Sequence, residues 1–187
     1  LPSDEDGGSV SWTQELAIAD QALSVMAADL GTADDARALQ DQASNWKNLW
    51  DADAGFFHGR LSDGRFEDPP QPSNWEPEFV EGTARQYLWL VPQDPEALFE
   101  TLGGEQAALE RLDEMMIEGE AEAEMRSHGV FGTWYWHGNE PGLHIPWLFA
   151  LAGDRASTQY WVDHLLSTAY GTGPDGLSGN DDGGTDG

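Results

Sequence analysis

Apolar residues recur at intervals of three and four along much of this chain, and that period constrains it to a helical fold. The first series consists of Leu16, Ala19, Leu23, Met26 and Leu30. It ends at Gly31, and Thr32 is placed to cap a second helix. The stripe that this second helix would bury consists of Ala36, Leu39, Ala43 and Trp46. Because only a short turn separates the two series, we expect an antiparallel helical hairpin.

Further helices are expected later in the chain, between loops of different length. Their predicted ranges are Pro77–Leu90, 104–118, Pro141–Leu151 and Ala156–Tyr170. Between residues 51 and 77 the periodicity gives way to Gly, Pro, Asp and aromatic residues, which indicates a long structured loop. Residues 120–124 form an acidic patch with little to bury, and residues 171–187 are rich in Gly and Asp. The sequence predicts an all-α fold of helical hairpins, without strands, whose long loops gather at one end.

Charge and composition exclude several classes of function. The chain has 8 Lys and Arg against 35 Asp and Glu, a formal net charge of −27. Such a field repels phosphate backbones, so we expect no nucleic-acid partner. With no cysteine, the chain has no disulfide and no thiolate chemistry. No apolar run is long enough to span a membrane, and the first residues do not read as a signal peptide.

Three segments combine carboxylates with aromatic residues or lie in Gly-rich sequence. They are 75–82, 134–141 and 179–184. Aromatic rings stack on the apolar face of a sugar, while carboxylates and amides bind its hydroxyl groups. Two carboxyl groups are also the minimum machinery for glycoside hydrolysis. The alternative is a solvated acidic surface, because most Asp and Glu residues face water.

Seven segments, in order along the chain, resemble signatures of glycoside hydrolase family 92. They are Asn45–Asp51, Gly55–Arg60, Phe79–Gly82, Gln86–Pro92, His137–Pro141, Thr158–Val162 and Pro174–Gly183. The resemblance covers nearly the whole chain from about Gly8. It implies an (α/α)6 toroid of helical hairpins, of which residues 1–187 are an incomplete portion. Within that portion, residues 1–9 are an irregular lead-in and residues 171–187 an active-site loop.

The same resemblance implies an activity and its partners. The family members are exo-acting α-mannosidases that invert the anomeric configuration and carry one Ca²⁺ ion at the active site. The implied substrate is a mannose-containing oligosaccharide or N-glycan, and the implied location is secreted, periplasmic or at the cell surface. The chain is then expected to need the rest of its own polypeptide, an N-terminal β-sandwich and the remaining helices.

Catalytic residues carry over from the matching motifs. Glu81 falls at the position of the general acid, and Asp182 at that of the general base. Asp181 is also implied as a catalytic residue beside Asp182. Asp181 and Asn180 would together hold the water or the metal shell. Glu140, with Asn139 beside it, resembles a substrate-contacting position and remains the alternative acid. The other expected substrate-binding residues are His137, His144, Arg60, Trp136 and Gln86.

Each of these residues also has a purely structural interpretation. Glu81 near a helix start would stabilise the helix dipole, and the acidic residues near position 181 would form turns. The histidines would be hydrogen-bonded neighbours of a site, and Arg60 would pair with Asp63 to brace a loop. The tryptophans Trp46, Trp89, Trp134 and Trp136 would belong mostly to the core.

Two departures from the family pattern matter. Arg85 stands where the family has a Trp before the Gln-Tyr pair, and about half of the helices of a complete barrel are present. An incomplete barrel exposes apolar faces. The rival to a mannosidase is therefore a carbohydrate-binding or inactive portion of such an enzyme, and a helical scaffold is a weaker rival.

Overall fold

The computed structural model describes residues 1–5, 7–66, 68, 71–125, 132–174 and 176–178. The chain divides into two units, Leu1–Gln93 and Asp94–Gly187, which are described separately below. Helices account for most of the regular structure, and the strands among the described residues are two residues long. The predicted all-α fold class is confirmed, whereas the expectation of no strands is wrong for these short strands.

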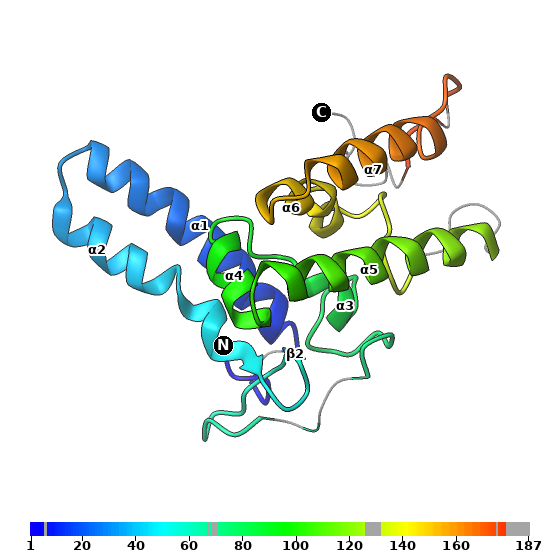
Figure 1. Ribbon diagram of the computed structural model, residues 1–187. Helices are drawn as coiled ribbons and strands as arrows, with labels where there is room; N and C mark the ends of the chain where they lie inside the picture. Colours follow the sequence, from blue (N-terminus) through cyan, green and yellow to red (C-terminus); the bar gives the residue numbers. More distant parts are fainter. Residues whose placement is uncertain (6, 67, 69–70, 126–131, 175, 179–187) are drawn as a thin grey trace. The chain divides into compact units, whose positions relative to one another are not determined.

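The first unit opens with the predicted helical hairpin. Helix α1 (Ser9–Asp29) and helix α2 (Ala33–Gln42) lie side by side and run in opposite directions (Figure 1). Gly31 joins them with a φ of 81°, a backbone conformation that glycine adopts without steric cost. Asp34 and Asp35 lie in the first turn of α2, where the helix dipole stabilises negative charge.

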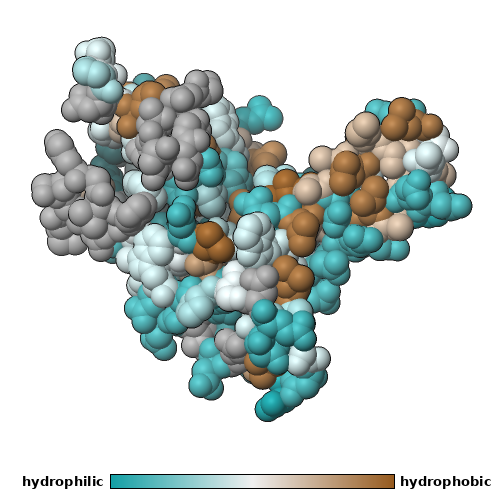
Figure 2. Space-filling model, turned by 180° about the vertical axis from the view of Figure 1, so that it is seen from behind, coloured by the Kyte–Doolittle hydropathy of each residue, from teal (hydrophilic) through white to brown (hydrophobic). Residues whose placement is uncertain are grey.

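The face by which α1 packs differs from the apolar stripe in its sequence. Its buried residues are Ser9, Val10, Ser11, Thr13, Gln14, Ala17, Ser24 and Ala27. Leu16, Leu23 and Met26 are each about half exposed, and Leu30 is 70% exposed. Figure 2 shows apolar side chains at the surface of this hairpin. Small side chains let α1 approach α2 closely, and Ser24 Oγ donates to the carbonyl of Ala36 at 3.0 Å.

A compact aromatic core follows the hairpin. The 3-10 helix η1 (Asn45–Leu49) leads into strand β1 (Trp50–Asp51), which pairs antiparallel with β2 (Phe56–Phe57). Trp46 and Phe57 are fully buried and meet edge to face, with ring centroids 5.8 Å apart. Trp89 is also buried, so Trp46 and Trp89 are core residues.

The predicted helix at Pro77–Leu90 is wrong over most of its length. The structure has only helix α3 (Ala84–Tyr87) there. Residues 77–82 form turns, because Glu81 adopts a φ of 51° and Thr83 caps the helix that follows. A left-handed residue followed by an N-cap ends any helix that comes before it.

The second unit begins with a helix that the periodicity did not indicate. Helix α4 (Pro95–Leu102) starts with Asp94 as its N-cap and Pro95 in its first turn, and it ends at Gly103 with a φ of 105°. Helix α5 (Glu105–Met125) extends past the predicted end at residue 118 and includes the acidic patch at residues 120–124, for which the sequence indicated little to bury. Glu122 on α5 accepts hydrogen bonds from the backbone of Thr133 and Trp134, so this part of the patch has partners.

Two helices close the second unit. After the short 3-10 helix η2 (Glu140–Gly142), helices α6 (Ile145–Leu151) and α7 (Arg155–Thr168) pack side by side (Figure 1). Thr158 Oγ1 accepts from the N–H of Ala150 and donates to the carbonyl of Pro146, both at 2.9 Å. An α-helix ordinarily joins these two backbone groups directly. Over the described residues, no helix is both long and apolar enough to cross a membrane.

We expect Thr158→Val to lower the free energy of unfolding of the second unit by about 1–3 kcal/mol, because it leaves buried backbone groups of α6 without a partner. Thr168→Val is the matched control on the same helix. Its hydroxyl donates to the carbonyl of His164 at an exposed position, so the expected loss is below about 0.5 kcal/mol. Urea unfolding followed by circular dichroism measures both. Equal losses would contradict a role for Thr158 in joining the helices.

Candidate active site

Glu81 is exposed and stands on an unusual backbone. Its φ of 51° makes it the one non-glycine residue with a positive φ in the described part of the chain. The left-handed conformation costs a non-glycine residue about 1–2 kcal/mol. Surrounding contacts therefore hold it there, and such conformations concentrate at functional sites.

The peptide before Glu81 is held from two sides. The N–H of Val80 donates to Ser11 Oγ at 2.8 Å, and the carbonyl of Val80 accepts from the Tyr87 hydroxyl at 2.6 Å. Two residues before Val80, the carbonyl of Glu78 accepts hydrogen bonds from the N–H groups of Val10 and Ser11, at 3.2 and 3.4 Å. Helix α1 and helix α3 thus fix the segment that ends at Glu81.

The residues after Glu81 form a tight start to α3. A Cβ at Gly82 would lie 2.6 Å from the Tyr87 ring, so this close approach requires glycine. Thr83 and Gln86 form a reciprocal capping box, in which the Gln86 Oε1 accepts from the N–H of Thr83 at 3.1 Å. Gln86 is 3% exposed and shapes this turn, whereas its predicted contact with substrate stays a prediction.

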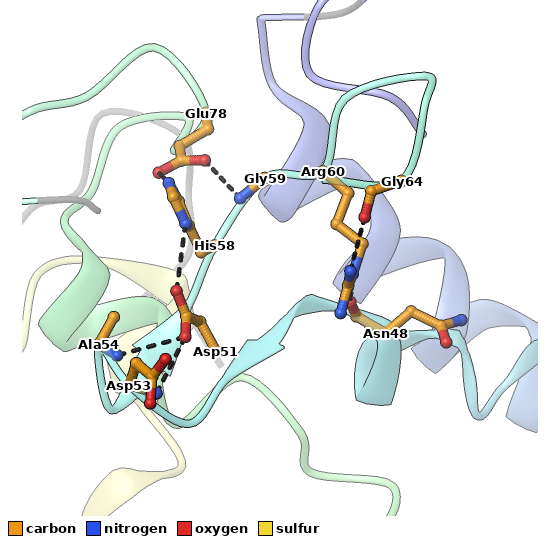
Figure 3. A network of polar contacts seen from close by, with 9 residues as sticks. All are labelled: Asn48, Asp51, Asp53, Ala54, His58, Gly59, Arg60, Gly64 and Glu78. Atoms are coloured by element: carbon orange, nitrogen blue, oxygen red, sulfur yellow. Dashed lines mark hydrogen bonds and ion pairs between the residues drawn. The ribbon is translucent and has the colours of Figure 1, made fainter. Parts of the chain in front are cut away.

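A buried histidine lies between two carboxylates, one of which, Glu78, belongs to the segment that ends at Glu81 (Figure 3). His58 is 1% exposed, with its Nδ1 3.7 Å from Asp51 Oδ2 and its Nε2 3.9 Å from Glu78 Oε1. The other oxygen of Glu78 accepts from the N–H of Gly59 at 2.6 Å. The network joins the loop that follows β2 to the segment of Glu81.

Arg60 braces the loop in which it lies. Its guanidinium donates to the carbonyls of Asn48 and Gly64 and stands 3.8 Å from the centre of the Phe66 ring (Figure 3). The Arg60–Asp63 pair considered from the sequence does not form. Asp63 instead binds Arg65 at 2.8 Å, and hydrogen bonds from Arg65 lower the pKa of Asp63. A sugar contact of Arg60 stays a prediction.

In the second unit, His137 is held between two tyrosines. Its Nδ1 lies 2.7 Å from the Tyr135 hydroxyl, and its Nε2 lies 2.7 Å from the Tyr170 hydroxyl. Burial lowers the pKa of His137 and raises the pKa of Tyr135. A neutral imidazole donates through one nitrogen and accepts through the other, so each tyrosine takes one role. Both nitrogens are thus used within the protein, as expected of a histidine that orients its neighbours.

The loop after His137 presents the remaining candidates of this unit. The N–H of Asn139 donates to the carbonyl of Trp136 at 3.3 Å, and the carbonyl of Asn139 accepts from Gly142 at 2.9 Å. Glu140 is exposed at the start of η2, and Trp136 and Asn139 are partly exposed. His144 is the N-cap residue of α6. These residues lie within one short stretch of the chain.

The predicted base and metal ligands lie outside the described residues. These are Asn180, Asp181 and Asp182. Among the residues that the structure describes, no group of three or more His, Asp or Glu side chains is arranged to hold a metal.

The sequence did not point to the groups that hold the candidates in place. Ser11 lies 69 residues before Val80, and Tyr170 lies 33 residues after His137. No local spacing marks such contacts. The one available signal was the pair of Gly82 and Thr83 after Glu81, which is typical of a turn before a capped helix.

We expect His137 to titrate below the ordinary histidine pKa of about 6.5. Because the unfolded chain then binds the proton more readily than the folded chain, this group's stabilisation is present above the unfolded pKa and is lost as the pH falls below it. Thermal unfolding between pH 7.5 and about 5 tests this. The wild type should lose more stability over that range than His137→Gln, and parallel curves would contradict the prediction.

Comparisons with known proteins identify the family of this chain. The model of the glycosyl hydrolase family 92 catalytic domain matches residues 1–187. Among curated proteins no match is found. The family GH92 alpha-mannosidase BT3965 from Bacteroides thetaiotaomicron is 34% identical, with a TM-score of 0.86 over 99% of this chain and 24% of its own.

A second solved structure agrees with the first. The family GH92 inverting mannosidase BT2199 from the same organism is 28% identical, with a TM-score of 0.87 over 99% of this chain and 26% of its own. The chain thus spans about a quarter of the length of these relatives. The (α/α)6 fold class is confirmed for the portion that the chain represents. With its full length matched by the family model and by these structures, the chain belongs to the glycosyl hydrolase family 92 catalytic domain family.

Proposed function

We propose that this chain is part of the helical catalytic domain of an inverting exo-α-mannosidase. The carrying observation is the family match over all 187 residues. Two similar structures support the activity, since one is of an alpha-mannosidase and the other of an inverting mannosidase. The substrate would be a glycan that ends in α-linked mannose.

Glu81 is the proposed general acid. Its exposed side chain stands on a strained backbone that two buried hydroxyl groups hold in place. In the reaction its carboxyl group gives a proton to the glycosidic oxygen while the bond from that oxygen to C1 breaks. Glu140, exposed at the start of η2, remains the alternative donor.

Asp182 is the proposed general base. It takes a proton from a water molecule whose oxygen attacks C1 from the face opposite the leaving group, so the product is β-mannose. Asp181 and Asn180 would orient this water. The proposal includes one Ca²⁺ ion with Asn180 and Asp181 among its oxygen ligands, and such an ion would bind sugar hydroxyl groups and favour a distorted ring. No step above depends on the ion.

The expected partners of this chain are an uncharged glycan and the rest of its own polypeptide. A protein of net charge −27 at pH 7 suits a neutral glycan better than a polyanion. We expect the activity to require the rest of the polypeptide, since the chain spans about a quarter of its relatives. Secretion, or a periplasmic or cell-surface location, is carried over from the family. The activity measurements below therefore use the longest polypeptide that includes these residues.

Asp182→Asn should lower kcat for release of mannose from α-mannobiose by about 10²–10⁴-fold, because it removes the base that activates water. Binding of mannoimidazole, with which the BT3965 relative was solved, should change little. Asp163→Asn, at an exposed position of α7, is the control and should keep full activity. Proton NMR of the first product should show the β-anomer. An α-anomer would rule out inversion, and binding without any release would favour the carbohydrate-binding alternative.

Because the proposed site includes Ca²⁺, we expect chelation with EGTA to abolish mannose release, and added Ca²⁺ to restore it where Mg²⁺ does not. Ca²⁺ accepts more oxygen ligands at longer distances than Mg²⁺, so the two ions separate a specific site from general screening of the acidic surface. Full activity after exhaustive chelation would remove Ca²⁺ from the proposal and leave the roles of Glu81 and Asp182 unchanged.

A further inference from the structure

The strained backbone at Glu81 depends on how the residue before it is held. Val80 is 42% exposed, so its side chain contributes little packing that could fix the peptide. Its backbone N–H and carbonyl are instead bound by two side chains, Ser11 and Tyr87. These two hydroxyl groups therefore control the direction in which the chain enters Glu81.

Both hydroxyl groups are themselves rigidly placed. Ser11 is 2% exposed in the first turn of α1, and the N–H of the same residue donates to the carbonyl of Glu78 at 3.4 Å. Tyr87 is 4% exposed, and its ring lies against Gly82 on one side and Phe79 on another, with ring centroids 5.6 Å apart for the latter pair. Their burial and contacts restrict the movement of both side chains.

We infer that Ser11 and Tyr87 are positioning residues for proton donation by Glu81. Together they hold the backbone N–H and carbonyl of Val80. Glu81 therefore keeps its left-handed backbone conformation, and its carboxyl group points in one direction. This inference rests on the proposed function, in which Glu81 is the general acid. Neither residue touches substrate in this account, because both are buried and act through the backbone of Val80.

The inference has a signature that a general loss of stability does not have. A misplaced acid impairs only the step in which the leaving oxygen takes a proton. A displacement of about 1 Å is enough to lower a rate about 10²-fold. Fluoride leaves as an anion and needs no proton for the bond to break. The loss should therefore be large for α-mannobiose and small for α-mannosyl fluoride.

The experiment compares Tyr87→Phe and Ser11→Ala with the wild type on both substrates. Tyr87→Phe keeps the ring that packs on Gly82 and removes only the hydroxyl. We expect kcat for α-mannobiose to fall about 10–100-fold with KM within about twofold, and kcat for α-mannosyl fluoride to stay within about threefold. Ser11→Thr, which keeps a hydroxyl, should recover most of the loss of Ser11→Ala.

Two further variants keep the outcomes distinct. Thr13→Val removes another buried hydroxyl of α1, one that donates to the carbonyl of Ser9 and does not contact Val80, so it should affect the two substrates equally. Glu81→Gln should show the strongest preference for fluoride. If Glu81→Gln loses both substrates alike, the proposed acid is wrong. Suppose instead that Glu81→Gln prefers the fluoride, while Tyr87→Phe and Ser11→Ala lower kcat equally for both substrates or for neither. The positioning role is then overturned.

Discussion

Helix α1 supplies the hydrogen bonds on which the rest of the first unit depends. From its first turns it donates backbone N–H groups to the carbonyl of Glu78, and its buried Gln14 donates to the carbonyls of Tyr87 and Leu90 at 2.9 and 3.2 Å. These carbonyls lie on both sides of Glu81, in a segment with little regular structure of its own. Polar groups of α1 thus replace the hydrogen bonds that a longer helix would supply.

Periodicity was sufficient to predict where most helices lie, and insufficient to predict which face they bury. The stripe of Leu16, Leu23 and Met26 marks α1 as a helix, yet the structure buries the opposite, smaller residues. Close approach to α2 favours the small side chains of Ser24 and Ala27 on the buried face. Helix α4 escaped notice because eight residues carry too little periodic signal, although its Asp-Pro start and Gly end follow standard capping rules.

Local motifs identify the candidate residues, whereas residues distant in the sequence orient them. Motifs identify Glu81, Glu140 and His137, because each stands in a short recognisable segment. The groups that orient them come from elsewhere: Ser11 for the peptide before Glu81, and Tyr170 for the ring of His137. The His58 network shows the same separation, since Glu78 meets Gly59 across 19 residues. Physical contacts of this kind leave no spacing in the sequence, so only the folded chain reveals them.

The 69-residue separation of Ser11 and Val80 also bears on how the site comes into being. A contact of that span closes a long loop, and the entropy of closure must be met before the contact stabilises anything. The carboxyl group of Glu81 is present as soon as the chain is made, but its orientation exists only after α1 has docked. The orientation of Glu81 is therefore a property of the completed unit and not of the local motif. A truncation that removed α1 would leave the sequence of the Phe79–Gly82 motif unchanged. It would remove the hydrogen bond from Val80 to Ser11 that helps to set the orientation of Glu81.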